Sequence, residues 1–311
     1  MKNVIITGAT GMIGRSLIDY LTKKDINVLA IVRRDGEFFP KNDKLKIIKC
    51  DLSNLKNLNL SQKYDTFYHL AWMKTTADGR NDYFTQTLNI NYTLDAVELA
   101  YRSGCKTFIG AGSQAEYGRV DGIISPNIKT NPENGYGIAK LAAGQMSRLL
   151  ANEHNIKHIW ARIISAYGPY DNESTMVMSS IKSMVDYGIS PEYTKAEQIW
   201  NYIYSKDVAK AFYLLGEKGI NNSIYCISST DAKQLFEYIE IIKNNIDPNI
   251  KLKIGAKDYL AKQVMNLKCD ISNLEKDTGF YPEYSFDEGI KETISWYKEM
   301  KGRKKCLTKM K

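Results

Sequence analysis

The sequence has few of the residues that build metal centres or disulfide frameworks. Only three of its 311 residues are histidine, and the five cysteines form no C-x-x-C pair. The cysteines are widely spread, at Cys50, Cys105, Cys226, Cys269 and Cys306. An odd number of dispersed cysteines predicts reduced thiols, and the lack of clustered histidines predicts no metal site.

Long apolar runs are also absent. No stretch approaches the roughly 18 to 20 apolar residues that a membrane-spanning helix needs. An apolar strand is expected almost from the first residue, at 4–7, which leaves no room for a signal peptide ahead of it. With 43% hydrophobic residues the chain can bury a full core, so we expect a globular cytoplasmic protein with no membrane partner.

Acidic residues are missing from the last eleven positions, and this absence accounts for most of the net charge of +8. Residues 301–311 contain six Lys or Arg and no Asp or Glu, which leaves about +2 for the remaining chain. No nucleic-acid-binding motif accompanies the charge. We therefore expect a basic, disordered tail at 301–311 and no specific nucleic-acid partner.

What the sequence does contain is a glycine-rich turn near its start. Residues 4–14 read VIITGATGMIG and place Gly8, Gly11 and Gly14 directly after an apolar strand. Glycines let phosphates approach the backbone, and the N–H groups and dipole of the following helix attract their negative charge. The turn therefore predicts a dinucleotide-binding site.

Strand and helix patterns alternate through the first half of the chain. Strands that are continuously apolar and separated by helices indicate a parallel sheet with helices on both faces. The expected fold class is α/β, a Rossmann-type doubly wound parallel sheet with a smaller C-terminal substrate lobe. Strands are expected at 4–7, 28–32, 47–50, 66–70, 107–111 and 159–164. Helices are expected at 14–23, 83–102, 136–153, 176–187, 207–217, 232–245 and 286–300.

The pattern changes after Gly168 and Pro169, and this change divides the chain. We expect a dinucleotide-binding domain at 1–170 and a substrate-binding lobe at 171–300, followed by the tail. A strand near 199–204 is expected to return from the lobe to the main sheet. A cleft between the two parts would hold the ligands.

Tyr136 and Lys140 stand four residues apart at the start of an expected helix, so both side chains leave one face of it. The spacing alone is weak, because three other Tyr-Lys pairs repeat it. Ser113 precedes Tyr136 by 23 residues and follows an expected strand, so a loop at the sheet edge can bring the two together. A phenol titrates at about pH 10, and a neighbouring ammonium group lowers its pKa toward neutrality. These residues are candidates for proton transfer.

The motifs of the chain occur in the order typical of one enzyme family. With the glycine turn they are Asp51-Leu52, His69-Leu70-Ala71, Asn89 with Thr93, Ser113 with Tyr117-Gly118, Tyr136 with Lys140, and Arg162 with Tyr167-Gly168-Pro169. The chain resembles the extended short-chain dehydrogenases/reductases, the group of nucleotide-sugar epimerases, dehydratases and ketoreductases. The resemblance implies that Tyr136 is the general acid/base, that Ser113 orients the substrate oxygen, and that Lys140 binds the nicotinamide ribose and lowers the Tyr136 pKa.

The resemblance also implies where the ligands lie. The implied cofactor-binding residues are Gly8, Thr10, Gly11, Met12, Ile13, Gly14, Arg33, Arg34, Asp51, Leu52, Leu70, Ala71, Asn89, Tyr136, Lys140 and Ile163. The implied substrate-binding residues are Trp72, Ser113, Gln114, Tyr117, Arg162, Gln198 and Trp200. A homodimer that pairs the helices at 83–102 and 136–153 of each subunit is implied as well.

The end of the second strand bears on the choice of cofactor. Arg33 and Arg34 stand where an NAD site commonly presents an acidic residue to the ribose hydroxyls. Guanidinium groups suit the 2′-phosphate of NADP instead. We expect NADP, and NAD stays possible because Asp35 follows directly.

The absence of acidic residues directly after Ser113 narrows the range of expected reactions. In the 4,6-dehydratases of the family, Asp and Glu follow the Ser or Thr that precedes the Tyr-Gly pair. Here Gln114 and Ala115 follow Ser113, and Glu116 is one position out of register, so dehydration is not expected. Segments 113–118 and 197–202 are most similar to the abequose-synthase-like 4-ketoreductases, although Trp200 replaces an arginine that grips the diphosphate in many members.

The expected function is NADPH-dependent reduction of a nucleoside-diphosphate 4-keto-6-deoxy sugar at C4, in deoxysugar biosynthesis for cell-surface polysaccharide. Two alternatives stay open. A nucleotide-sugar 4-epimerase needs the same three catalytic residues but retains NAD through oxidation and reduction. A non-catalytic protein would only bind NADP.

Overall fold

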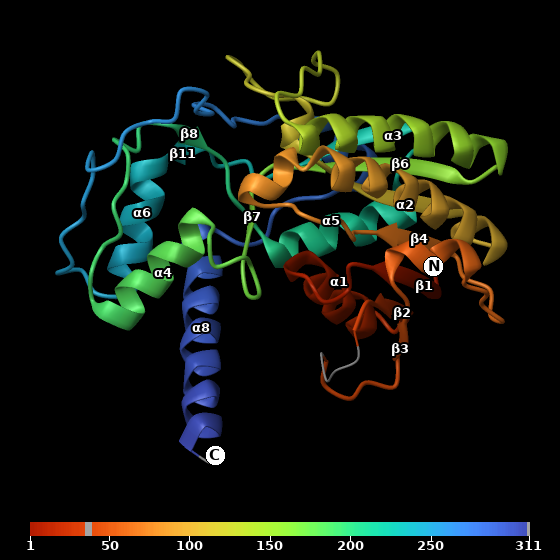
Figure 1. Cartoon of the computed structure of the whole chain (residues 1–311), viewed down its shortest axis with the longest axis horizontal. Coiled ribbons are helices and arrows are strands. Elements are labelled where there is room, and N and C mark those ends of the chain that lie inside the picture. The colour runs from red at the N-terminus through yellow and green to blue at the C-terminus, as the bar shows by residue number, and fades with distance from the viewer. Residues whose placement is uncertain (35–38, 310–311) are drawn as a thin grey trace.

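A seven-stranded parallel sheet forms the centre of the molecule (Figure 1). The computed structural model describes residues 1–34 and 39–309, the side chains at 77–78 and 303–309 excepted, so Asp35 lies outside the described residues. The strand order is β10-β6-β5-β4-β1-β2-β3. The strands are β1 Asn3–Thr7, β2 Asn27–Val32, β3 Leu45–Lys49, β4 Thr66–His69, β5 Thr107–Ser113, β6 Lys157–Ile163 and β10 Ser223–Ile227.

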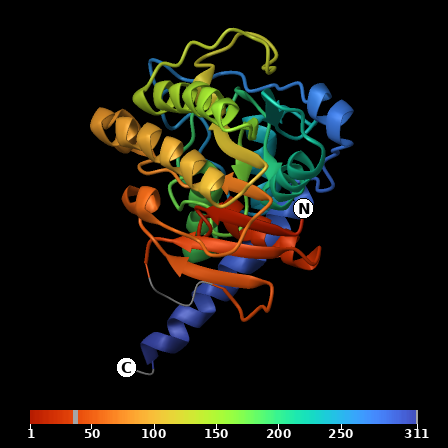
Figure 2. The same cartoon turned by 90° about the vertical axis from the view of Figure 1, so that its right-hand side faces the viewer.

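Helices cover both faces of this sheet (Figures 1 and 2). α1 (Met12–Lys23) packs against α5 (Ser205–Lys218) on one face, and α2 (Tyr83–Arg102) packs against α3 (Gly135–Glu153) on the other. The expected Rossmann-type fold is confirmed. Because the chain moves outward from β1 to β3 and then places β4 on the other side of β1, the strand order reverses beside β1. Sheets of this kind bind ligands at the carboxyl ends of the strands, at that reversal.

A smaller lobe lies beside the sheet and has little regular strand. Its helices are α4 (Met176–Tyr187), α6 (Leu235–Asn244) and α8 (Phe286–Lys309). Two short ladders join β8 (Ile199–Trp200) to β11 (Lys233–Gln234) and β7 (Ala166–Tyr167) to β9 (Ile203–Tyr204). The core of the lobe is rich in tyrosine, with buried residues that include Tyr167, Tyr193, Tyr202, Tyr204 and Tyr238.

The segment near 199–204 does not return to the main sheet as expected. The chain turns at Asn201, whose side chain bonds Ser229, and so splits the segment into β8 and β9. β10 takes the edge of the sheet instead, paired with β6, and α7 (Ser272–Thr278) packs on it. Residues 205–227 therefore return to the dinucleotide-binding half, beyond the expected boundary at 170.

The structure continues α8 as helix through residues 301–309, and the expected disorder of the tail stays a prediction. Tyr297 and Lys301 both donate to the carboxylate of Asp186 on α4, which ties this part of α8 to the lobe. Lysine, leucine and arginine are also good helix formers. Residues 310–311 lie outside the described residues. No described helix is both long and apolar enough to cross a membrane.

Candidate active site

Two glycines of the turn between β1 and α1 are required by packing. Gly8 has a φ of +72°, and a Cβ on it would lie 2.6 Å from the backbone nitrogen of Ala71. A Cβ on Gly14 would lie 2.3 Å from the carbonyl oxygen of Gly8. Gly8 thus adopts a left-handed conformation that other residues rarely take, and Gly14 lets the helix approach the turn. A side chain on Gly8 would displace the segment after β4, and one on Gly14 would push the helix away from the turn.

Gly11 has a different environment. A Cβ there would meet only the Gly8 carbonyl oxygen, at an ordinary contact distance of 3.5 Å, so the packing does not require glycine. Gly11 is the N-cap of α1 and provides no side-chain cap, and the first turn of the helix has no acidic residue. The N–H groups of that turn are available to an anion, and the missing side chain lets the anion approach. The turn therefore fits the diphosphate of a dinucleotide.

A cavity of about 680 Å³ opens along the turn and the ends of β2, β3 and β4. Its volume lies within the roughly 300–1,000 Å³ that is usual for small-ligand sites. Trp72, Met73 and Lys74 also line it. Eleven residues expected at the cofactor line the cavity, namely Gly8, Thr10, Gly11, Met12, Ile13, Gly14, Arg33, Asp51, Leu52, Leu70 and Ala71.

The other expected cofactor residues lie outside the lining. Arg34 is exposed beyond β2, and Ile163 is partly buried against the core. Asn89 is buried in α2, where its amide bonds both the N–H and the carbonyl of Met73, at 2.9 and 3.0 Å. Asn89 thus fixes the cavity wall. Tyr136 and Lys140 lie behind another wall residue, Trp72.

Ser113, Tyr136 and Lys140 come together at this wall. Ser113 ends β5, and its hydroxyl is close enough to the Tyr136 phenol to act against the rise in pKa that burial causes there. The Lys140 ammonium group lies 3.7 Å from the centroid of the Trp72 ring and donates to the carbonyl oxygen of Ala111 at 2.6 Å. The rings of Trp72 and Tyr136 meet edge to face, with centroids 6.0 Å apart. The three residues therefore form one cluster beside the cavity.

Burial dominates the electrostatics of the cluster. It raises the pKa of Tyr136, while the Ser113 hydroxyl and the charge of Arg80 act in the opposite direction. It also lowers the pKa of Lys140 to about 7, against the effect of Glu116. The Lys140 Nζ lies 5.8 Å from the Tyr136 ring centroid and donates to the Ala111 carbonyl oxygen, and its implied effect on the Tyr136 pKa stays a prediction.

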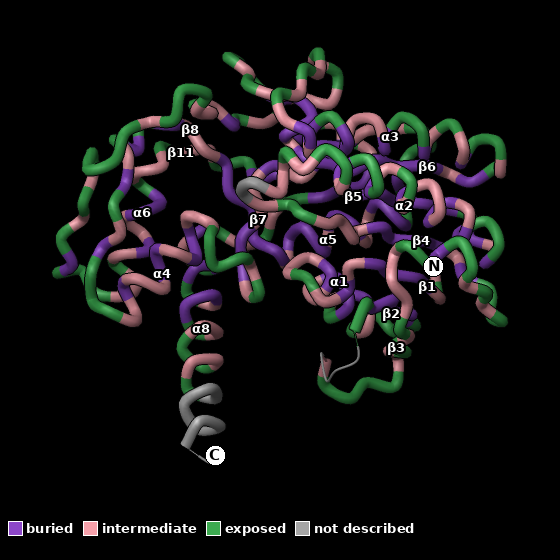
Figure 3. Tube along the Cα trace, viewed as in Figure 1, coloured by how far each residue is buried: buried purple, intermediate pink, exposed green. Residues whose placement is uncertain are grey.

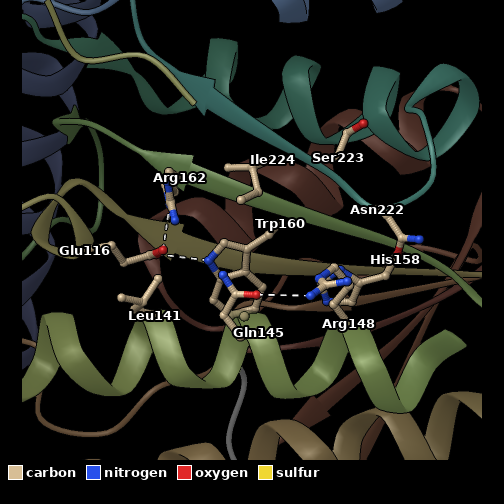
Figure 4. A pocket seen from close by; sticks show the side chains of 11 residues that line it. Glu116, Leu141, Gln145, Arg148, His158, Trp160, Arg162, Asn222, Ser223 and Ile224 are labelled. Carbon is tan, nitrogen blue, oxygen red and sulfur yellow. Dashed lines mark hydrogen bonds and ion pairs between the residues drawn. The ribbon is translucent and has the colours of Figure 1, made fainter. Parts of the chain in front are cut away.

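Glu116 organises the loop that carries Ser113. Its Oε1 accepts from the backbone N–H of Ser113 at 2.8 Å. The same oxygen accepts from the Trp160 indole at 3.0 Å (Figure 4). Its Oε2 accepts from Arg162 Nε at 2.6 Å, and both charged side chains are buried, at 0% and 2% exposed. The expectation that Arg162 binds substrate is corrected, because a buried carboxylate needs a paired cation and Arg162 serves that purpose.

The remaining expected substrate residues are not gathered at one place. Gln114 accepts from the Ser113 hydroxyl at 3.0 Å and stays beside the catalytic cluster. Tyr117 and Gln198 are buried, with the Tyr117 hydroxyl 3.2 Å from Cys226 Sγ. Trp200 is partly buried, and its indole donates to Ser165 at 2.8 Å.

Sequence reasoning missed two charged groups of the cluster. The guanidinium carbon of Arg80 lies 4.6 Å from the Tyr136 ring centroid, in a segment with no motif. Glu116 did carry a signal, since Ser113 and Glu116 have the S-x-x-E spacing of a capping box, and both bonds of that box are present. Within the described residues no three or more His, Cys, Asp or Glu side chains form a group that could hold a metal ion.

The chain has relatives along nearly its whole length. It is 25% identical over 311 residues to dTDP-4-dehydro-6-deoxyglucose reductase of Escherichia coli, covering 94% of this chain and 96% of the relative. It is 22% identical over 332 residues to dTDP-glucose 4,6-dehydratase of Haemophilus influenzae, covering 96% and 98%. The structure of UDP-N-acetylglucosamine 4-epimerase from Methanobrevibacter ruminantium has the same fold, with a TM-score of 0.87, 24% identity and coverage of 96% and 99%.

The family model of the NAD dependent epimerase/dehydratase family matches residues 4–228. This span runs from β1 to the end of β10 and includes the glycine turn, Ser113, Tyr136 and Lys140. The chain therefore belongs to the NAD-dependent epimerase/dehydratase family, among the extended short-chain dehydrogenases/reductases, and is an NAD(P)-dependent oxidoreductase or epimerase.

Proposed function

We propose that the protein reduces a nucleoside-diphosphate 4-keto-6-deoxy sugar at C4 with NADPH, in deoxysugar biosynthesis. The observation that carries this proposal is the Ser113–Tyr136–Lys140 cluster beside the glycine-lined cavity. When bound, NADPH supplies the hydride that adds to C4. Tyr136 donates its proton to the carbonyl oxygen, and Ser113 donates a hydrogen bond to the same oxygen as negative charge develops on it. The product is the C4 alcohol and NADP⁺.

Reduction is favoured over dehydration by the groups beside Ser113. Elimination of water needs an acid and a base that reach the sugar. Gln114 has an amide, Ala115 has no polar group, and the Glu116 carboxylate is held by Arg162 and Trp160 in the core. No side chain of this segment supplies the required acid and base.

Arg33 supports NADP as the cofactor. It lines the cavity, and its charge contributes to lowering the pKa of Asp51, after the hydrogen bonds from Ser53. A guanidinium group in this place pairs with a 2′-phosphate. We expect Arg33→Ala to weaken NADPH binding about tenfold, the loss of one charge-assisted contact, and to leave NADH binding unchanged. Equal affinities of the wild type for NADPH and NADH would contradict this choice of cofactor.

The reaction is tested with purified protein, NADPH and a panel of nucleoside-diphosphate 4-ketosugars. Consumption of NADPH at 340 nm together with formation of the C4 alcohol is the expected result. Gln114 and Trp72 are the proposed sugar contacts, because Gln114 adjoins Ser113 and Trp72 lines the cavity.

The second candidate is a nucleotide-sugar 4-epimerase. The same cluster serves both reactions, and a 4-epimerase is among the proteins with the same fold. An epimerase would convert a nucleoside-diphosphate hexose to its C4 epimer with catalytic NAD and no net change of absorbance at 340 nm. Incubation with UDP-glucose or UDP-N-acetylglucosamine, followed by analysis of the sugar, distinguishes the two.

We also propose a homodimer through α2 and α3. Exposed residues, coloured green in Figure 3, recur along both helices. They include large apolar side chains, with Phe84 exposed at 87%, Tyr83 at 67% and Leu149 at 55%. Apolar groups this exposed on adjacent helices are typical of a surface that another subunit covers. The double substitution Phe84→Glu and Leu149→Glu should give a species with the mass of one chain in analytical ultracentrifugation.

A further inference from the structure

Arg80 lies against the ring of Tyr136. It belongs to η2 (Ala77–Asn81), which follows β4 along the cavity side of the molecule. Its guanidinium carbon is 4.6 Å from the centroid of the Tyr136 ring. A cation so placed interacts favourably with the neutral ring and more strongly with the phenolate, which carries a full negative charge.

Hydrogen bonds from two helices hold the segment that carries Arg80. Gln86 of α2 donates to the carbonyl oxygens of Gly79 and Lys74, at 2.9 and 3.0 Å. Asn81 accepts from the backbone N–H of Gly135 at 3.1 Å, one residue before Tyr136. The segment is thus tied both to α2 and to the start of α3, which sets the position of Arg80 relative to Tyr136.

Arg80 retains an unsatisfied donor at this position. Its Nε is buried and has no hydrogen-bond partner among the described residues. A buried donor without an acceptor carries a desolvation cost. The contact of the Arg80 guanidinium group with the Tyr136 ring is the favourable interaction that accompanies this cost.

Three charged groups face Tyr136 from the elements packed around it. Arg80 approaches from η2, Lys140 from α3 and Glu116 from η3. The Lys140 ammonium group is 5.8 Å from the ring centroid and donates to Ala111. Burial and Glu116 raise the pKa of Tyr136, whereas Ser113 and Arg80 lower it.

We propose that Arg80 is a positioning residue for the acid–base step, which holds the Tyr136 ring in place and stabilises the phenolate left after proton transfer. The inference rests on the proposed role of Tyr136 and extends it. A fixed positive charge beside the ring needs no rearrangement when the phenolate forms.

The test measures the phenol directly and needs no substrate. 3-Fluorotyrosine replaces Tyr136 by site-specific incorporation, and its ¹⁹F resonance is followed against pH in the full chain. Fluorination lowers the pKa of the phenol and brings its titration into a range where the fold is intact. Arg80→Gln should raise the pKa of this residue by about 1, the lower end of the effect of an adjacent cation. Arg80→Lys should restore part of the difference.

Two further variants make the result specific. Arg119→Gln removes an exposed arginine that pairs with Glu133 and should leave the resonance unchanged. Asn81→Ala keeps Arg80 but releases η2 from Gly135, and should raise the pKa by a smaller amount. If Arg80→Gln does not fold, Asn81→Ala and Arg80→Lys still decide the matter. An unchanged pKa in the folded Arg80 and Asn81 variants would overturn the proposal.

The dependence of the reaction rate on pH distinguishes a failure of this inference from a failure of the proposed function. Because the protonated phenol is the acid in ketone reduction, the rate falls as pH rises through its pKa, and Arg80→Gln should move that fall to higher pH. Full activity of Tyr136→Phe would refute the proposed function. An unmoved pH profile in Arg80→Gln, with Tyr136→Phe inactive, would refute only the role of Arg80.

Discussion

The cofactor end and the catalytic end of the site are built from different materials. The glycine turn consists of backbone groups and missing side chains, and its cavity is lined by short segments that follow β1, β2, β3 and β4. The catalytic cluster consists of side chains whose pKa values depend on burial and on the charges of Arg80 and Glu116, which come from separate elements. Binding at the first end depends on the course of the backbone, whereas chemistry at the second depends on contacts between side chains.

The largest expected effect is at the catalytic end. Tyr136→Phe removes the proton donor but keeps the ring beside Trp72 and Arg80. Turnover should fall about 10³-fold, the usual contribution of general acid catalysis, while NADPH binding stays close to that of the wild type. Steady-state assays and fluorescence titration of NADPH measure the two quantities. If turnover and NADPH affinity fell together, the catalytic end and the cofactor end would not act independently.

The buried pair behind Ser113 should give the next largest effect. Glu116→Gln leaves Arg162 charged and unpaired in the core, which should reduce the free energy of unfolding by about 3 kcal/mol. Urea unfolding measures this change. The matched control is Glu133→Gln, which breaks the exposed pair with Arg119 and should leave the unfolding midpoint unchanged. Equal effects of the two variants would show that burial of the pair is unimportant.

Two glycine substitutions examine the cofactor end. Gly11→Ala should fold normally and weaken NADPH binding about tenfold, because a Cβ at the helix start obstructs one charge-assisted contact. Gly8→Ala should destabilise the protein itself, since its Cβ would lie 2.6 Å from Ala71 N and its φ is positive. Thermal unfolding and NADPH titration of both variants distinguish them. A destabilised Gly11→Ala would mean that packing, not the ligand, requires this glycine.

The smallest expected effect is a pH dependence of stability at Lys140. Its pKa is lowered from 10.5 to about 7 in the folded protein. Above about pH 7 the folded state releases a proton that the unfolded state still holds, so stability rises with pH. Relative to Lys140→Met, the ligand-free wild type should gain about 1 kcal/mol in free energy of unfolding between pH 7 and pH 8. Lys23→Met, at an exposed position, should follow the wild type. If the free energy of unfolding changed with pH in the same way for the wild type and Lys140→Met, burial of the Lys140 ammonium group would not destabilise the folded protein.

The six strands expected from the sequence are all present. Five of them lie between two neighbouring strands of the sheet, whereas β3 lies at its edge and is only partly buried. β10 was not predicted. Its five residues pair with β6, and this pairing depends on the course of the chain between them, which the sequence pattern does not indicate. The glycine-turn residues were predicted because they follow an apolar strand directly in the sequence. Arg162 was misplaced because its partner Glu116 is 46 residues away, and that distance leaves no local pattern. Arg80 has no motif, and its contact with Tyr136 exists only in three dimensions.

The return of residues 205–227 to the dinucleotide-binding half has a consequence for how such proteins diversify. α5 and β10 stand in the chain between lobe segments, so the lobe is interleaved with the sheet instead of appended to it. A recombination event at residue 170 would remove an edge strand and the partner helix of α1 along with the lobe. Exchange of lobes between relatives therefore needs several matched crossovers, and new specificity in this architecture is acquired more readily by point substitution than by swapping modules.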